Sequence, residues 1–242
     1  MMAKITRGMI MAAGLGLRMR PLTNDRPKPL VEVGGRTLLD HAIDRFKAAG
    51  IEMIVVNVHY KAEMIEAAVR KRTDIEIRIQ DERDKLLNTG GALKRALPNF
   101  NGEPFLTYNS DSIWLEGMGS NLERLMRRWN EAEMDCLMLL AATFSAIGYD
   151  ERGDFTMDAN GRLARRESQR IAPFAWPGVQ IIHPRLIERG KGEIFSTNQL
   201  WDIAIEEGRL FGIRMDGKWM HIGTPAARDE AEEYLRDLHA LA

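Results

Sequence analysis

A loop with two glycines, directly behind an apolar stretch, constrains the fold of this chain more than any other feature. Residues 8–13 are mostly apolar, and Gly14 and Gly16 follow them. Because glycine lacks a Cβ, it accepts positive φ angles and lets backbone N–H groups approach an anion. Arg18 and Lys28 come shortly afterwards and can balance negative charge. The segment therefore predicts a buried strand followed by a loop that binds a nucleoside triphosphate.

Prolines at positions 21, 27 and 29 border this loop. We expect them to keep the loop extended, because proline fixes φ and restricts the residue before it. Two familiar phosphate-binding motifs do not fit. A dinucleotide-binding fingerprint requires a third glycine where Met19 stands, and a P-loop requires Gly-Lys followed by Ser or Thr. The alternative is a simple glycine turn bordered by solvated basic residues.

Strands and helices alternate along the first half of the chain. Apolar runs and helical spacing predict strands at 51–58, 75–80 and 105–108 and helices at 38–46, 62–70 and 90–97. This alternation predicts a Rossmann-like α/β fold, in which a mixed, mainly parallel sheet is flanked by helices. Ligands bind beyond the carboxyl ends of such strands, where Gly14, Asn57, Gln80 and Asp111 all fall.

The second half of the chain has a looser pattern. Residues 154–158 and 163–166 flank Asn160-Gly161, a pair typical of a hairpin turn. We expect one domain over residues 1–242, with a smaller lobe at about 143–218. Proline and helical spacing predict a closing helix from Pro225 to about Leu241.

Composition limits the partners of the chain. Thirty-four basic and 35 acidic residues give a net charge of −1, so no overall field attracts nucleic acid or an anionic membrane. The single cysteine, Cys136, lies in an apolar run and cannot form a disulfide within the chain. No apolar run has the length of a membrane span, and the N-terminal residues lack the apolar core of a signal peptide. We expect a cytoplasmic monomer or homodimer without nucleic-acid or membrane partners.

The pattern A-A-G-x-G-x-R-M-x-P-L-T at 12–23, with P-K-P-L at 27–30, resembles the signature of sugar-1-phosphate nucleotidyltransferases. The resemblance extends over nearly the whole chain and implies the nucleotide-diphospho-sugar transferase fold. It further implies that the smaller lobe at about 143–218 binds the sugar. It also implies that a sugar 1-phosphate attacks a nucleoside triphosphate, giving a nucleotide sugar and pyrophosphate, with Mg²⁺ as the cofactor. Gly14, Gly16 and Arg18 would then bind the triphosphate, and Lys28 would lie near the reacting phosphate.

Finer features of the resemblance concern the substrates. The compact length, Glu82, Thr89-Gly90-Gly91 and the I-G-T-P ending at 222–225 favour UTP and N-acetylmuramate 1-phosphate. A mannose-1-phosphate guanylyltransferase is the alternative within the same reaction class. From another class, the alternative is a regulatory protein that binds nucleotide sugars without turnover.

Two residues are candidates for a metal site. Asp111 follows the strand at 105–108, and a carboxylate there suits Mg²⁺, which prefers oxygen ligands. The resemblance supports Asp111, because the family's N-G-D segment carries the metal aspartate, although Ser110 replaces the glycine. An aspartate that caps a turn is the alternative. Many family members have W-x-D-V-G-T, with a second metal aspartate, where this chain has His221. Imidazole suits Mg²⁺ poorly, so packing or hydrogen bonding is equally open for His221.

Two further regions are candidate substrate contacts. Gln80 and Glu82 lie at the end of a strand, and paired glycines after Thr89 open a helix and leave room for a flat base. The resemblance implies that these segments read the base, and an ordinary helix start is the alternative. The predicted nucleotide-binding residues are Ala12, Ala13, Gly14, Gly16, Arg18, Lys28, Gln80, Glu82, Thr89 and Gly90. The predicted catalytic residues are Arg18, Lys28 and Asp111. By loose resemblance, the predicted sugar-binding residues are Asn109, Asp154, Glu167 and Asn198, with Asn57, His59 and Trp176 as weaker candidates for a site role.

Overall fold

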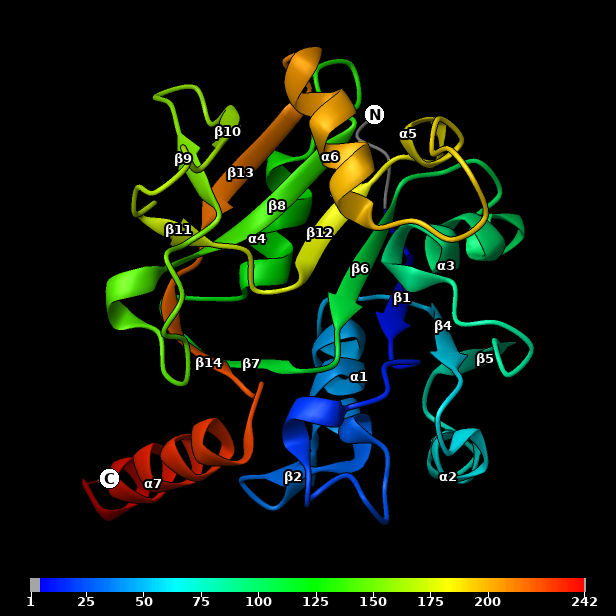
Figure 1. Cartoon of the computed structure of the whole chain (residues 1–242), viewed down its shortest axis with the longest axis vertical. Coiled ribbons are helices and arrows are strands. Elements are labelled where there is room, and N and C mark those ends of the chain that lie inside the picture. The colour runs from blue at the N-terminus through cyan, green and yellow to red at the C-terminus, as the bar shows by residue number, and fades with distance from the viewer. Residues whose placement is uncertain (1–4, 242) are drawn as a thin grey trace.

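A ten-stranded sheet runs through the molecule, which the computed structural model describes over residues 5–241. Residues 1–4 lie outside this range. They are part of the N-terminal segment from which we predict that the chain has no signal peptide. The strand order is β10-β9-β11-β8-β12-β6-β1-β4-β5, with β13 also beside β8 (Figure 1). The strands are β1 (Arg7–Met11), β4 (Met53–Val58), β5 (Glu76–Asp81), β6 (Phe105–Asn109), β8 (Cys136–Ala142), β9 (Phe155–Met157), β10 (Leu163–Arg165), β11 (Phe174–Ala175), β12 (Val179–Ile182) and β13 (Leu210–Arg214).

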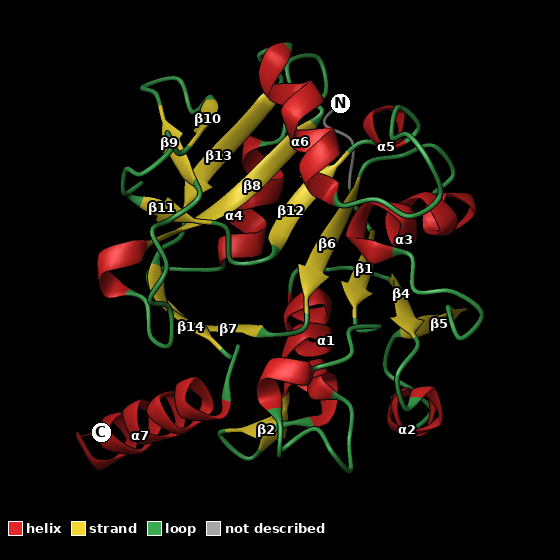
Figure 2. Cartoon of the chain, viewed as in Figure 1, coloured by secondary structure: helices red, strands yellow, loops and turns green. Residues whose placement is uncertain are grey.

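Helices cover both faces of this sheet (Figure 2). The helices on these faces are α1 (Leu38–Ala48), α2 (Ala62–Val69), α3 (Asn88–Ala96), α4 (Asn121–Arg128), α5 (Pro184–Ile187) and α6 (Thr197–Glu206), and the helix α7 (Pro225–Leu241) lies apart from them. The helices α1, α2 and α4 share a buried core with Ile10 and Val56, whereas α3, α5 and α6 share another with Met9 and Val55. Neighbouring residues of β1 and β4 thus serve opposite faces, as the two-residue period of a strand requires. The predicted fold class, a mixed α/β sheet flanked by helices, is confirmed.

The first four strands of the large sheet, β1, β4, β5 and β6, are parallel. Gly8 of β1 lies opposite Ile54 of β4 and Leu106 of β6, and β4 pairs in the same direction with β5. All six residues of β4 are buried, as expected for a strand with helices on both faces. The carboxyl ends of β1, β4, β5 and β6 therefore meet at one edge of the sheet.

Residues 143–218, where a smaller lobe within the domain is predicted, contribute strands to the large sheet. β12 lies between β6 and β8, antiparallel to both, and β13 runs parallel to β8. All four residues of β12 are buried, because this short apolar strand has core on both faces. The hairpin β9–β10 and the strand β11 extend the far edge. The predicted hairpin turn is confirmed: Gly161 has φ +87°, and Asp158 accepts N–H bonds from Asn160 and Arg162.

The glycine loop, residues 12–30, is coiled rather than extended. Short 3₁₀ turns form at Leu17–Met19 and Lys28–Leu30. The expectation from the prolines is wrong because Pro29 lies in the first turn of a 3₁₀ helix, where a backbone N–H has no intrahelical partner to lose. Thr23 Oγ1 donates to the carbonyl of Gly16 at 2.8 Å. This coiling brings Lys28 beside Gly16.

The closing helix α7 has the predicted range and lies beside β2 (Glu32–Val33), away from the large sheet (Figure 1). Two small sheets lie nearby: β2 pairs with β3 (Arg36–Thr37), and β7 (Ser112–Glu116) pairs with β14 (Gly217–His221). Ala231 of α7 joins a third buried core with Met19, Ile113 and Met220. The helix therefore supports the glycine loop from behind. Within residues 5–241 no helix is long and apolar enough to span a bilayer.

Candidate active site

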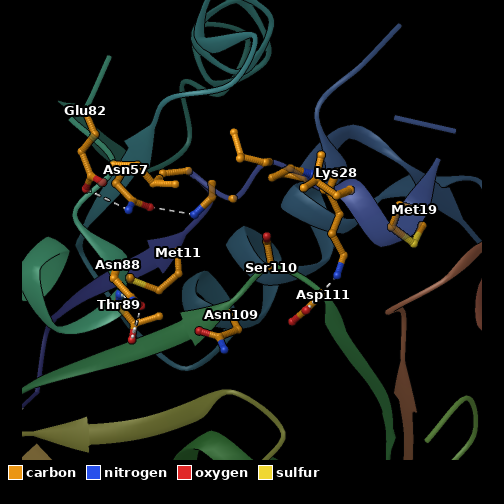
Figure 3. A pocket seen from close by; sticks show the side chains of 18 of the residues that line it. Met11, Met19, Lys28, Asn57, Glu82, Asn88, Thr89, Asn109, Ser110 and Asp111 are labelled. Atoms are coloured by element: carbon orange, nitrogen blue, oxygen red, sulfur yellow. Dashed lines mark hydrogen bonds and ion pairs between the residues drawn. The ribbon is translucent and has the colours of Figure 1, made fainter. Parts of the chain in front are cut away.

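A cavity of about 610 Å³ lies at the carboxyl ends of the parallel strands (Figure 3). Its walls come from the glycine loop, the strand ends, the start of α3 and a segment around Ile194. The predicted site residues that line it are Ala12, Ala13, Gly14, Gly16, Arg18, Lys28, Glu82, Thr89, Asn109 and Asp111. Gln80 and Gly90 are buried and do not line the cavity. The strand-end rule thus brings together residues that are distant in sequence.

The two glycines of the loop have different structural roles. Gly16 has φ +64°, and a Cβ there would come within 3.2 Å of Lys28 Cβ and Thr23 Cγ2, so the turn itself requires glycine. A Cβ on Gly14 would meet nothing within 4 Å, so the space beside Gly14 belongs to the cavity. Arg18 is exposed, and within residues 5–241 its side chain forms no hydrogen bond or ion pair. The loop therefore offers an anion both space and an unpaired guanidinium.

Lys28 and Asp111 form an ion pair at this end of the cavity. Lys28 Nζ lies 2.8 Å from Asp111 Oδ2, and the two side chains are 14% and 25% exposed. Burial raises the pKa of Asp111, but the surrounding groups, with the ammonium of Lys28 foremost, together hold that pKa below its ordinary value. Asp111 is therefore an ionised carboxylate on the cavity wall.

The residues at this end fit Mg²⁺. In the described part of the chain, no group of three His, Cys, Asp or Glu side chains could hold a metal by itself. Mg²⁺ commonly keeps several waters and takes one or two carboxylates together with substrate phosphates. Asp111 meets that requirement, because it is ionised and faces a cavity of nucleotide size.

His221 approaches Asp111 from a separate strand pair. It ends β14, opposite Ser112 of β7, and the next residue, Ile222, donates its N–H to the Asp111 carbonyl at 2.9 Å. The imidazole lies among the rings of Trp219 and Tyr149. Burial lowers the pKa of His221, so the ring is neutral at pH 7. Aromatic packing is its observed role, and metal coordination by His221 stays a prediction.

The opposite end of the cavity is built around Glu82, which is 1% exposed. Glu82 Oε1 accepts hydrogen bonds from Asn57 Nδ2 at 2.9 Å and Gln80 Nε2 at 2.7 Å. Asn57 Oδ1 accepts the N–H of Ala12 at 2.7 Å (Figure 3). From the sequence, Asn57 is only a weaker candidate for a site role. Its place inside the apolar run MIVVNV could have indicated more, because a buried polar side chain needs a hydrogen-bond partner.

The paired glycines of α3 are expected to leave room for a base, but in the structure they pack against another segment of the chain. A Cβ on Gly90 would lie 2.4 Å from the ring of Phe195, and one on Gly91 would lie 2.2 Å from the carbonyl oxygen of Glu193. Both glycine N–H groups donate to the carbonyl of Phe195. The glycines therefore leave room for a distant segment of the chain rather than for a base. Thr89, just before them, does line the cavity.

The predicted sugar-binding residues do not all line the cavity. Asn109 lines the cavity. The three others have protein partners away from it: Asp154 accepts the N–H of Trp176 at 2.8 Å, Asn198 accepts from Arg165 at 3.0 Å, and Glu167 pairs with Arg170 at 3.0 Å. Their contact with a sugar stays a prediction.

The fold and the cavity define the class of this protein as an α/β nucleotide-binding protein. Arg18 and the Lys28–Asp111 pair lie at one end of the cavity, and Glu82 with its hydrogen-bond partner Asn57 lies at the other. The chain belongs to the nucleotidyl transferase family, whose sequence model matches residues 7–153. That range contains the glycine loop, Glu82 and Asp111.

Relatives of known activity extend this assignment. The chain is 42% identical to the N-acetylmuramate α-1-phosphate uridylyltransferase of Caulobacter vibrioides, over 95% of this chain and 96% of the relative. It is 28% identical to the catalytic subunit beta of mannose-1-phosphate guanylyltransferase from Danio rerio, over 90% of this chain and 61% of that protein. The structure of UDP-glucose pyrophosphorylase from Acinetobacter baumanii superposes with a TM-score of 0.76 at 15% identity, covering 99% of this chain and all of that one. The last comparison shows a shared fold.

Proposed function

We propose that the protein transfers the uridylyl group of UTP to N-acetylmuramate α-1-phosphate and releases pyrophosphate. The observation that carries the proposal is a cavity with a cationic end and an end built around Glu82, in a chain 42% identical to a uridylyltransferase over nearly its whole length. Mg²⁺, with Asp111 as its protein ligand, belongs to the proposal. So do a cytoplasmic location and a monomeric or homodimeric state.

The chemistry is a single displacement at phosphorus. An oxygen of the sugar phosphate attacks the α-phosphorus of UTP, and the bond from that phosphorus to the bridging oxygen breaks. Pyrophosphate leaves with the bonding electron pair, so no covalent enzyme intermediate is needed. Because two anions must approach each other, the site must orient them and offset their charge. Arg18 and the loop amides bind the triphosphate, and Lys28 offsets charge at the reacting phosphate. Bound Mg²⁺ supplies further charge stabilisation.

Glu82 supports uracil as the base. Its Oε1 already accepts two N–H donors, so Oε2 is the carboxylate oxygen left for a ligand. Uracil presents one N–H, at N3, between two carbonyl groups. Guanine presents two adjacent N–H groups and would use both carboxylate oxygens, whereas cytosine presents a bare ring nitrogen. One remaining acceptor therefore matches uracil, and equally thymine, better than guanine or cytosine.

Pyrophosphate release tests the proposal directly. UTP, GTP, CTP and dTTP are each incubated with Mg²⁺ and the 1-phosphates of N-acetylmuramate, glucosamine, glucose and mannose, with Asp111→Ala as the inactive control. We expect selective turnover of UTP with N-acetylmuramate 1-phosphate. Turnover of GTP with mannose 1-phosphate would replace the substrates and keep the chemistry. Nucleotide binding without turnover of any pair would favour the regulatory alternative.

A further inference from the structure

A buried asparagine joins the two ends of the cavity. Asn57 is 2% exposed and lies one residue before the end of β4. Its Oδ1 accepts the N–H of Ala12, where the glycine loop begins, and its Nδ2 donates to Glu82 Oε1. The contact with Ala12 fixes the amide orientation, because only the oxygen of an amide can accept an N–H. One side chain therefore positions both the loop and the carboxylate.

The donation to Oε1 decides what Glu82 can offer a ligand. Asn57 and Gln80 together supply two donors, which use the lone pairs of that oxygen. Oε2 has no hydrogen-bond partner among residues 5–241, and Glu82 lines the cavity. A base with a single ring N–H matches this arrangement. A base with paired N–H groups, or with an unprotonated ring nitrogen at that position, does not.

We propose that Asn57 is a positioning residue that sets nucleotide specificity, by holding Glu82 with one free acceptor oxygen toward a uracil-type base. This inference rests on the proposed function and adds to it the group that selects the base. Gln80 shares the task, but it also donates to the carbonyl of Ala92 at 3.0 Å, so its loss would disturb α3 as well. Asn57 is therefore the residue on which specificity can be tested separately.

Asn57→Asp and Asn57→Ala test the proposal together. The aspartate keeps the shape and the acceptor for Ala12 but places a second carboxyl group against Glu82. Two such groups at hydrogen-bond distance cannot both ionise, so Glu82 becomes a shared proton site and a poorer acceptor. Alanine removes the donor outright. In both variants we expect kcat/KM for UTP to fall at least about tenfold relative to that for CTP, mainly through KM. Dissociation constants from calorimetry should shift in the same direction.

Asn121→Asp is the matched control. Asn121 is also fully buried, and its Nδ2 donates to the carboxylate of Glu116, but it lies on α4 outside the cavity lining. This variant should lower the melting temperature and keep the preference for UTP. If the folded Asn57 variants keep the wild-type preference for UTP over CTP, the inference is overturned. If Asn57→Asp does not fold, the result for Asn57→Ala alone decides. A wild-type protein inactive with UTP would instead overturn the proposed function, and nucleotide binding would still test Asn57.

Discussion

In the proposed function, single residues at the cationic end of the cavity serve the reaction more than the fold. Lys28 and Asp111 neutralise each other across 2.8 Å in partly buried surroundings. Desolvation offsets much of the attraction in such a pair, so its net contribution to stability is small. Its value lies in keeping a cation and a carboxylate ready beside the glycine loop. A phosphate or a metal ion can then exchange partners with either group.

Asp111→Asn should reduce kcat at least about hundredfold, because an amide neither offsets the charge of Lys28 nor binds Mg²⁺ well. Lys28→Ala should have a comparable effect through loss of the cation. Pyrophosphate release measures kcat, and the melting temperature should change little. Asp229→Asn is a suitable control, since Asp229 is 69% exposed. Wild-type turnover in Asp111→Asn would refute the role of Asp111.

Gly14→Ala should separate binding from folding. A Cβ at this position meets no protein atom within 4 Å, so the free energy of unfolding should change by less than about 0.5 kcal/mol. The added methyl group enters the space proposed for the triphosphate, and KM for UTP should rise at least about tenfold, equivalent to roughly 1.4 kcal/mol. Denaturation in urea and steady-state kinetics measure the two effects. An unchanged KM would show that the phosphates bind elsewhere.

At the scale of elements, α3 is shaped by its neighbour rather than by a ligand. Gly90 and Gly91 let the segment ending at Phe195 pack directly on the helix, which places Ile194 in the cavity wall. The sequence cannot reveal this use of the glycines, because the segment that fills the space lies far along the chain. Asp111 was predictable because parallel strands end at one edge, whatever their distance in sequence.

Gly91→Ala should show the pattern opposite to that of Gly14→Ala. A Cβ at 2.2 Å from the Glu193 carbonyl oxygen must displace the backbone of that segment, at a cost of about 1–3 kcal/mol in unfolding free energy. Urea denaturation measures this loss. Wild-type stability in Gly91→Ala would mean that the segment does not pack on α3 in solution.

At the scale of the whole molecule, Asp135 connects the late strands of the sheet. It precedes β8, its side chain is 5% exposed, and it contacts Arg185 of α5 at 2.7 Å and Arg209, next to β13, at 2.9 Å. Burial raises the pKa of Asp135, but the hydrogen bonds from both arginines outweigh burial and lower it. The apolar sequence of β12 does not indicate which strands lie beside it. Its position between β6 and β8 could therefore not be predicted from the local sequence pattern. The ion pairs of Asp135 with Arg185 and Arg209 join residues that are distant in sequence, and a local sequence pattern does not reveal such contacts.

Asp135→Asn should destabilise the protein in a pH-dependent way. The native pKa lies below the unfolded value of about 3.9, so the stabilisation is present above that pH and is lost as the pH falls through the native pKa. The difference in unfolding free energy between wild type and variant should be about 1–3 kcal/mol near neutral pH and should shrink below about pH 4. Urea denaturation at several pH values measures it. A difference that stays constant down to pH 3, about one unit below the unfolded pKa, would contradict the assignment.

The central position of β12 also bears on how the chain is made. Its residues are synthesised after both β6 and β8, the two strands between which it lies. Until it arrives, the facing edges of those strands carry unpaired backbone groups beside apolar side chains, the kind of edge that recruits other chains. A chain released before residue 179 keeps both edges open. Biosynthesis, rather than the finished fold, is therefore the stage at which this protein is most prone to aggregate.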